Sequence, residues 1–314
     1  MELKFTDDYF KAEEIDGFFV EEKMKRAWAA NLVVLKDFAD ICEKYDLKWL
    51  AGYGTLLGAV RHKGYVPWDD DIDIIMPRTD YMTFIKKAVK ELPKGYYHFN
   101  IYNDTSMKNY LTRVVNHPSI DYTDEMLDKY YGCPYACGID ICPLDYLPRD
   151  KGELDVYKQL IMITSSAADH IEKGEVEYGE QKKLLSDIER MTKVKINRGM
   201  DIPNQLRILT DRICATYGEA DADFMGMAIR QDENKDYYSK KDAYEIITMP
   251  FEVTKINAPK GYDEILRKHY GNYTVKIKDI GHDYPFYKAQ EEALTEYKEK
   301  TGSESVKVFS LLQN

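Results

Sequence analysis

The chain of 314 residues carries 55 acidic and 44 basic side chains, which gives a formal net charge of −11 at pH 7. This acidic balance argues against a nucleic-acid groove, because binding to phosphate backbones needs clustered Lys and Arg. A chain of this length with 44% hydrophobic residues can bury a substantial core, as one large domain or two modest ones.

The location of the protein is expected from two negative observations. No apolar run approaches the roughly 18 residues of a membrane-spanning helix, and the first residues lack the basic flank and apolar stretch of a signal peptide. The five cysteines are an odd number in a chain large enough to fold without disulfides, which fits a reducing compartment. We therefore expect a cytoplasmic protein and leave open a peripheral contact with the inner face of the membrane.

The first expected element is a long amphipathic helix over residues 21–45. Its apolar side chains recur at helical spacing, at Met24, Trp28, Leu32, Leu35, Phe38 and Ile41. Residues 47–54 predict a short buried strand that ends in glycines, and residues 55–64 predict a short helix that Gly64 stops.

The next stretch predicts the sheet. Residues 71–77 alternate acidic and aliphatic side chains, which is typical of a strand with one acidic face and one apolar face. A helix is expected over 78–95, and further strands over 96–103, 110–117 and 138–145. We therefore predict an α/β fold with a mixed sheet and flanking helices, followed by a mainly helical second part.

The second part of the chain begins at Lys151. Gly and Pro are rare from there to about residue 217, which favours helices over 151–217. Beyond it we expect strands within 244–253 and a helix over 262–271 with Gly271 at its C-cap. The tail 301–314 is expected to be loosely held.

Four aspartates lie within five positions, at Asp69, Asp70, Asp71 and Asp73. Because side chains at i and i+2 of a strand point to the same face, roughly 7 Å apart, we expect Asp71 and Asp73 to lie together. Carboxylate oxygens are hard ligands that favour Mg²⁺ or Mn²⁺ over zinc. Asp140 lies in a similar aliphatic frame, and it is a third candidate ligand with an oxygen available to orient or deprotonate an attacking hydroxyl.

Other interpretations of these acids stay open. Asp69, Asp71 and Asp73 occupy positions of an EF-hand calcium loop, but the glycine and glutamate that such a loop needs are missing. A solvated acidic turn without a ligand is a simpler alternative. Asp140 alone is also compatible with a hydrogen-bonded structural role.

Phosphate contacts are expected near the start of the second predicted helix. Gly54 and Thr55 open this helix directly after a strand, so their free backbone N–H groups are candidates for phosphate binding. Arg61 and Lys63 lie between that turn and the acids, where they would neutralise a diphosphate. Arg113 is a weaker candidate of the same kind.

The order of strand, G-[ST], short helix and D-x-D between hydrophobic residues resembles the nucleotidyltransferase fold. The stretch GYGTLLGAVRHKGYVPWDDDIDIIMPRTDY resembles more closely the signature of the LicD family, bacterial phosphocholine transferases related to fukutin-type ribitol-phosphate transferases. GIDICPLD and APKGYDEILRKHYGNY resemble further blocks of that family. With the resemblance we expect a nucleotidyltransferase-like catalytic core over 1–150 and a C-terminal part, 218–314, that completes the LicD-like domain. The helical stretch 151–217 matches no block of that family and is expected to be an insertion or subdomain.

The resemblance also implies an activity. A phosphorylated alcohol, such as phosphocholine, would be transferred from a CDP-linked donor to a hydroxyl of a cell-surface glycan or lipid-linked saccharide, in teichoic acid or lipopolysaccharide synthesis, with release of CMP. By position, Asp71 and Asp73 would bind Mg²⁺ or Mn²⁺, and Asp140 would complete the site and act as base. Gly54 and Thr55 would contact the donor phosphates.

Three functional questions stay open at this point. A choline group would need aromatic faces around its trimethylammonium, and candidates are Trp68, Tyr130, Tyr131 and Tyr135. A nucleotidyltransferase of the same fold would instead attack an NTP and release pyrophosphate. A non-catalytic module would use the acidic strand as a metal-dependent binding site.

Overall fold

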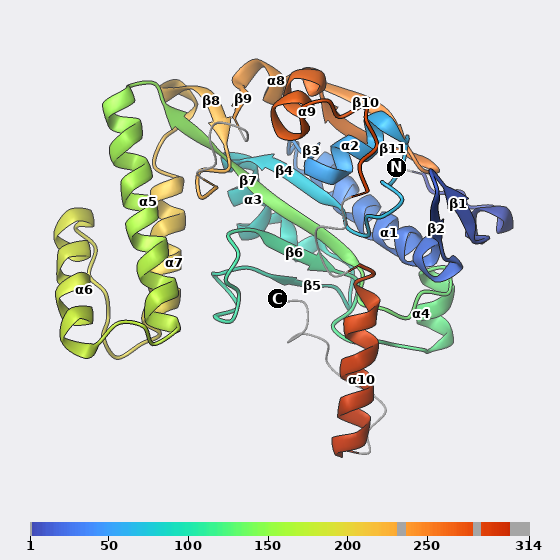
Figure 1. Cartoon of the computed structure of the whole chain (residues 1–314), viewed down its shortest axis with the longest axis horizontal. Helices are drawn as coiled ribbons and strands as arrows, with labels where there is room; N and C mark the ends of the chain where they lie inside the picture. Colours follow the sequence, from blue (N-terminus) through green and yellow to red (C-terminus); the bar gives the residue numbers. More distant parts are fainter. Residues whose placement is uncertain (1, 231–236, 279–283, 302–314) are drawn as a thin grey trace. The chain divides into compact units, whose positions relative to one another are not determined.

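The computed structural model describes residues 2–230, 237–278 and 284–301 (Figure 1). The chain divides into two compact units. The first, called the sheet unit, comprises the described parts of residues 1–98, 112–142 and 242–314. The second, called the helical unit, comprises residues 99–111 and the described parts of 143–241.

The sheet unit contains most of the strands. Its helices are η1 (Asp7–Phe10), α1 (Glu22–Lys44), α2 (Tyr53–Arg61), α3 (Arg78–Lys86), η2 (Ala88–Glu91), α4 (Asp124–Lys129), α9 (Tyr262–Tyr270) and α10 (Tyr287–Thr301). Its strands are β1 (Glu13–Ile15), β2 (Phe18–Val20), β3 (Leu50–Ala51), β4 (Asp73–Pro77), β6 (Thr112–Val115), β10 (Ile246–Phe251) and β11 (Thr254–Pro259). Strands β5 (Tyr97–Phe99) and β7 (Gly138–Pro148) and helix α8 (Lys240–Tyr244) cross the boundary between the units.

The main sheet has the strand order β3-β4-β7-β6-β5. β3 pairs antiparallel with β4, and β6 pairs antiparallel with β7 so that Arg113 lies opposite Asp140. The Asp140 backbone N–H donates to the Ile72 carbonyl at 2.9 Å, which places β7 beside the acidic segment. The predicted mixed α/β fold is confirmed.

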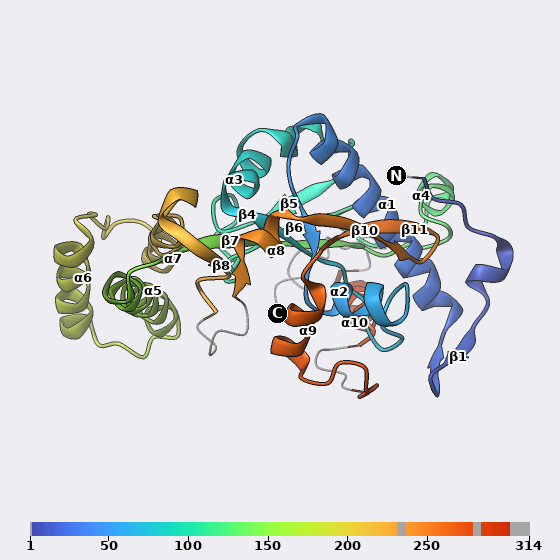
Figure 2. The same cartoon turned by 90° about the horizontal axis from the view of Figure 1, so that it is seen from above.

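Helices cover both faces of this sheet. In Figure 2, α3 and the end of α1 lie on one side, and α2 and α9 lie on the other. Every apolar residue predicted on the inner face of α1 is buried, and Phe38 packs edge-on against Phe84 of α3 with ring centroids 5.1 Å apart. The apolar face of α1 therefore forms part of the hydrophobic core of the sheet unit.

Several predicted elements have different bounds in the structure. α2 begins at Tyr53, two residues before the predicted start, and ends at Arg61. It ends there because the chain turns at Lys63 with φ 58° and brings the Gly64 carbonyl against Gly58. β4 begins at Asp73, so Asp71 lies in the segment before the strand. The predicted helix over 78–95 is α3 followed by the separate 3₁₀ turn η2, and β7 continues to Pro148.

Some elements were not expected from the sequence. β1 and β2 form a hairpin whose turn residues Asp16 and Gly17 both have positive φ, as the Asp-Gly turn of such hairpins requires. α4, which Thr123 caps, and α10 were also missed. The predicted α9 helix with Gly271 at its C-cap is confirmed, whereas residues 302–314 of the predicted loose tail lie outside the described residues.

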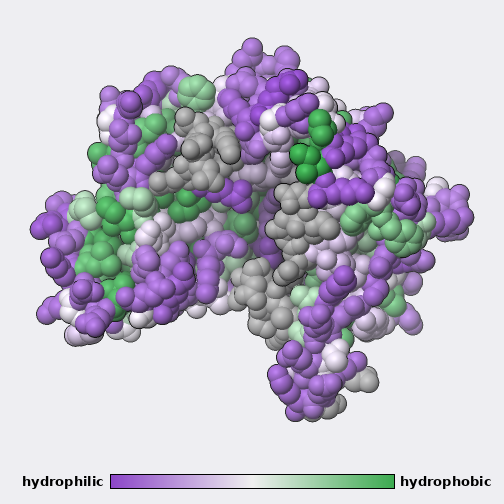
Figure 3. All heavy atoms as spheres, in the orientation of Figure 1, coloured by the Kyte–Doolittle hydropathy of each residue, from purple (hydrophilic) through white to green (hydrophobic). Residues whose placement is uncertain are grey.

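The helical unit confirms the helices predicted over 151–217. Its helices are α5 (Lys151–Glu172), α6 (Tyr178–Thr192), α7 (Ile202–Cys214) and η3 (Glu219–Asp221), and its short strands are β8 (Ala222–Gly226) and β9 (Tyr238–Ser239). One buried cluster includes Ala168, Ile188 and Leu206, one residue from each long helix. Figure 3 shows hydrophobic side chains at the surface over α5 and α6. That this unit is an insertion stays a prediction.

In the part of the chain that the structure describes, none of the helices combines the length and the apolar composition needed to cross a bilayer.

Candidate functional site

Three aspartates and one arginine meet where β4, β7 and β6 lie side by side. Nε and Nη2 of Arg113 each donate to a different oxygen of Asp140, both at 2.6 Å. The pKa of Arg113 is held above its usual value, chiefly by Asp140 and then by Asp71 and Asp73. The structure therefore brings the predicted carboxylates of Asp71, Asp73 and Asp140 near one another and adds Arg113, which is bonded to Asp140.

The crowding of these acids has its clearest effect on the pKa of Asp71. Burial raises its pKa well above the usual range, and the charges of Asp73, Asp69, Asp140 and Asp70 raise it further, in that order. Carboxylates crowded in this way are stabilised by a nearby cation. Arg113 is one such cation, and its contacts are directed to Asp140.

The acids suit a hard divalent cation, but the side chains do not surround one as they stand. Within residues 2–230, 237–278 and 284–301, no group of three or more His, Cys, Asp or Glu side chains is arranged to hold a metal ion. Arg113 binds both oxygens of Asp140, so it competes with any metal for that carboxylate. The predicted metal site of Asp71, Asp73 and Asp140 stays a prediction.

Buried polar side chains hold the acidic segment in place. Asp70 is 3% exposed, and its Oδ2 accepts the backbone N–H of Phe286 at 2.7 Å. Asn31 of α1 donates to the Asp70 carbonyl at 3.0 Å and accepts the Gly138 N–H at 2.8 Å. Asn31 therefore ties the acidic segment to the first residue of β7, two positions before Asp140.

Sequence reasoning missed Asn31. Its signal was present, because Asn31 is a polar residue on a helix face that is otherwise apolar, beside Trp28, Leu32 and Leu35. A buried amide needs hydrogen-bond partners, and here both partners are backbone groups of the site. Trp28 has a similar role, since its indole N–H donates to the Asp69 carbonyl at 3.0 Å.

Gly54 and Thr55 position the acids. A Cβ atom added to Gly54 would lie 2.4 Å from Oδ2 of Asp69, so a side chain there would require the Asp69 carboxylate to move. The buried Thr55 hydroxyl accepts the backbone N–H of Asp73 at 2.8 Å. The first turn of α2 is thus joined to the acidic strand, and contact of Gly54 and Thr55 with donor phosphates stays a prediction.

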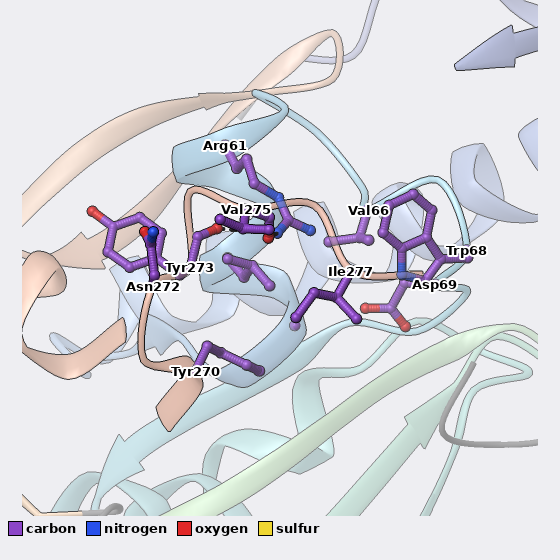
Figure 4. Close-up of a pocket in the computed structure, with 11 residues that line it drawn as sticks. Arg61, Val66, Trp68, Asp69, Tyr270, Asn272, Tyr273, Val275 and Ile277 are labelled. Atoms are coloured by element: carbon purple, nitrogen blue, oxygen red, sulfur yellow. Dashed lines mark hydrogen bonds between the residues drawn. The ribbon is translucent and has the colours of Figure 1, made fainter. Parts of the chain in front are cut away.

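Arg61 lies at the other end of α2, on the wall of a cavity of about 270 Å³ that Gly54 and Asp69 also line (Figure 4). Its Nη1 donates to the backbone carbonyls of Tyr273 and Val275, at 3.1 and 3.3 Å. Lys63 is exposed, and its carbonyl accepts the Glu252 N–H at 2.7 Å. Of the two basic residues, Arg61 is the one that faces a cavity beside the acids.

The aromatic candidates for a choline site lie in different surroundings. Tyr130 and Tyr135 are buried, and Tyr135 stacks on Tyr287 with centroids 5.1 Å apart. Tyr131 packs against Phe5 at 4.6 Å. Trp68 lines the cavity beside the acids.

Comparisons with known proteins show which sequences this chain resembles. Residues 47–129 match the family model described as "LicD/FKTN/FKRP, nucleotidyltransferase domain". The chain is 26% identical over 258 residues to the lipopolysaccharide cholinephosphotransferase LicD of Haemophilus influenzae, which covers 77% of this chain and 88% of the relative. An uncharacterised protein of Rickettsia typhi is 39% identical over 71 residues, which is 22% of this chain and 23% of that protein.

Residues 47–129 therefore carry a LicD-type nucleotidyltransferase domain. The matched segment runs from before β3 to the end of α4. It includes Gly54, Thr55, Asp71, Asp73 and Arg113. Asp140 follows the matched segment in the sequence. In the sheet it lies next to Ile72 and Arg113, which belong to that segment.

Proposed function

We propose that this chain transfers phosphocholine, or a similar phosphorylated alcohol, from a CDP-linked donor to a hydroxyl of a cell-surface glycan or its lipid-linked precursor, and releases CMP. Similarity to a lipopolysaccharide cholinephosphotransferase over most of both chains supports the choice of head group and acceptor. The CDP-linked donor comes from the family resemblance of the sequence motifs.

The observation that carries the proposal is the convergence of Asp71, Asp73 and Asp140 around the guanidinium of Arg113. Phosphoryl transfer depends on placing the two reactants and on screening the charge that develops on the phosphate oxygens. Asp71 and Asp73 can bind a cation, Arg113 supplies a positive charge, and Asp140 can accept a proton. A structural ion pair alone would not need two further aspartates beside it.

In the proposed reaction, the acceptor oxygen forms a bond to the phosphorus that carries the alcohol. The bond from this phosphorus to the bridging oxygen breaks, and its electron pair leaves with CMP. The acceptor proton passes to Asp140, which becomes available when Arg113 transfers its hydrogen bonds to the donor phosphates. The guanidinium fork binds phosphate and carboxylate with the same bidentate geometry, so this exchange keeps Arg113 fully bonded.

Asp71 and Asp73 would hold Mg²⁺ or Mn²⁺, with Asp140 as a further ligand. The pKa of Asp71 is raised first by burial and then by the neighbouring carboxylates, so a cation among these acids would stabilise its charged form. When bound, the ion would screen the diphosphate and stabilise the leaving nucleotide.

The test is product analysis on the full chain. CDP-choline, CDP-ribitol and CDP-glycerol are each incubated with lipopolysaccharide or a deacylated glycan acceptor, with Mg²⁺ or with EDTA, and the released nucleotide is identified. We expect CMP in stoichiometric amounts with labelled glycan, highest for CDP-choline, and no release in EDTA. Release of CMP that is independent of acceptor and metal would contradict the proposal.

A second function is tested in parallel, because the matched domain is described as a nucleotidyltransferase domain. The chain is incubated with each of the four NTPs, Mg²⁺ and the same acceptors. Pyrophosphate release with nucleotide on the glycan would replace our proposal by NTP-dependent transfer. Absence of turnover with every donor, together with metal-dependent ligand binding, would favour a non-catalytic module.

A further inference from the structure

A second cavity lies at the N-terminal segment of the sheet unit. Its walls come from η1, β1, α1, the end of α2 and the turn between β10 and β11. Its volume is about 360 Å³, within the roughly 300–1,000 Å³ that is usual for small-molecule sites. In the described part of the chain, no residue lines both this cavity and the one that Arg61 faces. We call it the Tyr9 cavity, and its buried or half-buried polar side chains include Tyr9, Lys25, His62 and Glu252.

The hydroxyl of Tyr9 is buried, and within residues 2–230, 237–278 and 284–301 it has no hydrogen-bond partner. Burial and then the charge of Glu252 raise its pKa, so the hydroxyl stays protonated. Glu252 therefore lies near Tyr9, but not in the geometry of a hydrogen bond. Buried polar groups in folded proteins almost always have a partner in the protein, in water or in a ligand. The Tyr9 hydroxyl is thus a donor for a molecule in the cavity.

Lys25 and Glu252 have hydrogen-bonding capacity toward the same cavity. Lys25 is 5% exposed, and its ammonium donates to Glu13. An ammonium has three N–H donors, and no second acceptor bonds to Lys25 in the described part of the chain. Oε1 of Glu252 accepts the Tyr65 N–H at 2.9 Å, which fixes the carboxylate and leaves Oε2 as an acceptor. The cavity therefore combines two kinds of donor with an acceptor.

The charges of the cavity disfavour a ligand that carries a charge. Burial raises the pKa of Glu252, and Lys25, which is paired with Glu13, lowers it again in part. A cation in the cavity would meet the Lys25 ammonium, and an anion would meet the carboxylates of Glu13 and Glu252. Burial, more than any neighbouring charge, lowers the pKa of His62 to about 4, so its ring is neutral at pH 7. The other charged lining residues are exposed and of opposite sign, Asp8 and Lys63.

The aromatic walls of the cavity do not suit a trimethylammonium group. The Lys25 ammonium lies 5.4 Å from the centroid of the Tyr9 ring and already takes the cation site on that ring. Trp28 and Tyr65 are buried and stack on each other with centroids 4.7 Å apart. A sugar ring has neutral hydroxyls, each of which donates and accepts hydrogen bonds. It therefore matches the donors, the acceptor and the balance of charge in the cavity.

We propose that the Tyr9 cavity is a subsite for a neutral sugar, whose hydroxyls bond to Tyr9, Lys25 and Glu252. The subsite goes beyond the proposed transfer reaction and does not rest on it, because none of these residues belongs to the acidic cluster. Trp28 joins the two places, since it lines the Tyr9 cavity and its indole N–H donates to the Asp69 carbonyl at 3.0 Å. A sugar bound here would lie one side chain away from the acidic segment.

The test is titration of the full chain with three neutral methyl glycosides, those of glucose, galactose and N-acetylglucosamine, followed by saturation-transfer NMR. The buffer contains EDTA and no nucleotide, so that turnover does not affect the result. Choline and glucuronate are the charged comparison ligands. We expect at least one glycoside to bind, and neither charged compound to displace it.

Three variants separate binding from folding. Tyr9→Phe should weaken glycoside binding at least about threefold, the loss of one hydrogen bond, without lowering the melting temperature, because the hydroxyl has no partner in the folded chain. Glu252→Gln keeps an acceptor for the Tyr65 N–H and should also weaken binding. Tyr157→Phe is the matched control: its buried hydroxyl donates to the Cys214 carbonyl at 2.7 Å, so the melting temperature should fall and glycoside binding should stay unchanged.

The outcomes are independent of whether a CDP-alcohol is turned over. Weaker glycoside binding by Tyr9→Phe at an unchanged or higher melting temperature supports the subsite. No glycoside binding by the wild-type chain, which would leave the cavity to ordered water only, overturns it. Unchanged affinity in Tyr9→Phe and Glu252→Gln, or tighter binding of choline or glucuronate than of any glycoside, also overturns it. If Tyr9→Phe loses both stability and affinity, the affinity of Glu252→Gln decides.

Discussion

Buried hydroxyl and amide side chains hold different parts in place in the two units. In the helical unit, the hydroxyls of Thr164 and Thr210 bond to each other at 2.8 Å and to carbonyls of their own helices. In the sheet unit, Asn31 and Thr55 bond to backbone groups of other segments, and those segments carry the acids. The Thr164–Thr210 bond joins two helices to each other, whereas Asn31 and Thr55 hold in place the segments that carry the acids.

Removing an acid should have the largest effect. Asp73→Asn is expected to reduce transfer about a thousandfold or more, since a cation anchor is worth several kcal/mol in the transition state. The melting temperature should stay the same or rise, because a repulsive charge is removed. CMP release and thermal unfolding measure the two effects, with Asp187→Asn in the helical unit as the control. Normal turnover of Asp73→Asn would refute the role of the acidic pair.

Removing the Arg113 side chain should raise the affinity for metal ions and lower the transfer activity. Arg113→Met is expected to tighten Mn²⁺ binding at least about tenfold without donor, because a positive charge within a few ångströms of the acids is lost. The same variant should lose most transfer activity.

Arg113→Lys separates the charge of Arg113 from its shape. Lys keeps the positive charge, so Mn²⁺ affinity should stay close to wild type, but it lacks the bidentate fork, so transfer should still fall. Electron paramagnetic resonance of Mn²⁺ measures binding independently of turnover. Equal Mn²⁺ affinity for wild type and Arg113→Met would show that Arg113 and the metal do not compete for these acids.

Two threonine substitutions test the comparison between the units with the same chemical change. Thr55→Val leaves the Asp73 N–H without its acceptor, which should cost about 2 kcal/mol of unfolding free energy and reduce transfer. Thr210→Val leaves no backbone N–H unpaired, so we expect below about 1 kcal/mol and unchanged transfer. Urea unfolding measures both, and Thr55→Ser should recover stability and activity. Equal losses of unfolding free energy in Thr55→Val and Thr210→Val would contradict a special role of Thr55 in positioning the acidic strand.

Much of the site was predictable because its signals are local. The alternation around Asp71 and Asp73 and the glycines before Thr55 depend on neighbours in the sequence, and the structure keeps the predicted strand–helix–strand order there. The bounds were less accurate. α2 ends at Arg61 because the chain turns at Lys63. The helical pattern of the segment does not predict this turn.

The contacts of the site could not be predicted in the same way. Arg113 was only a weak candidate for phosphate binding, yet it lies opposite Asp140 and binds both of its oxygens. The pairing depends on the register between β6 and β7, which a one-residue shift would reverse. The contacts of Asn31 with Asp70 and Gly138 depend on how α1 packs on the sheet.

The sequence by itself determined which residues carry charge next to aliphatic partners, and therefore that Asp71, Asp73 and Asp140 each follow a pattern typical of a strand. Only the tertiary structure decided that they meet, that Arg113 lies beside them and that Arg61 faces a cavity next to them. The physical reason is the range of the interactions. Hydrophobic periodicity acts between neighbours in the chain, whereas charge pairing and cavity shape depend on segments that only the folded sheet brings together.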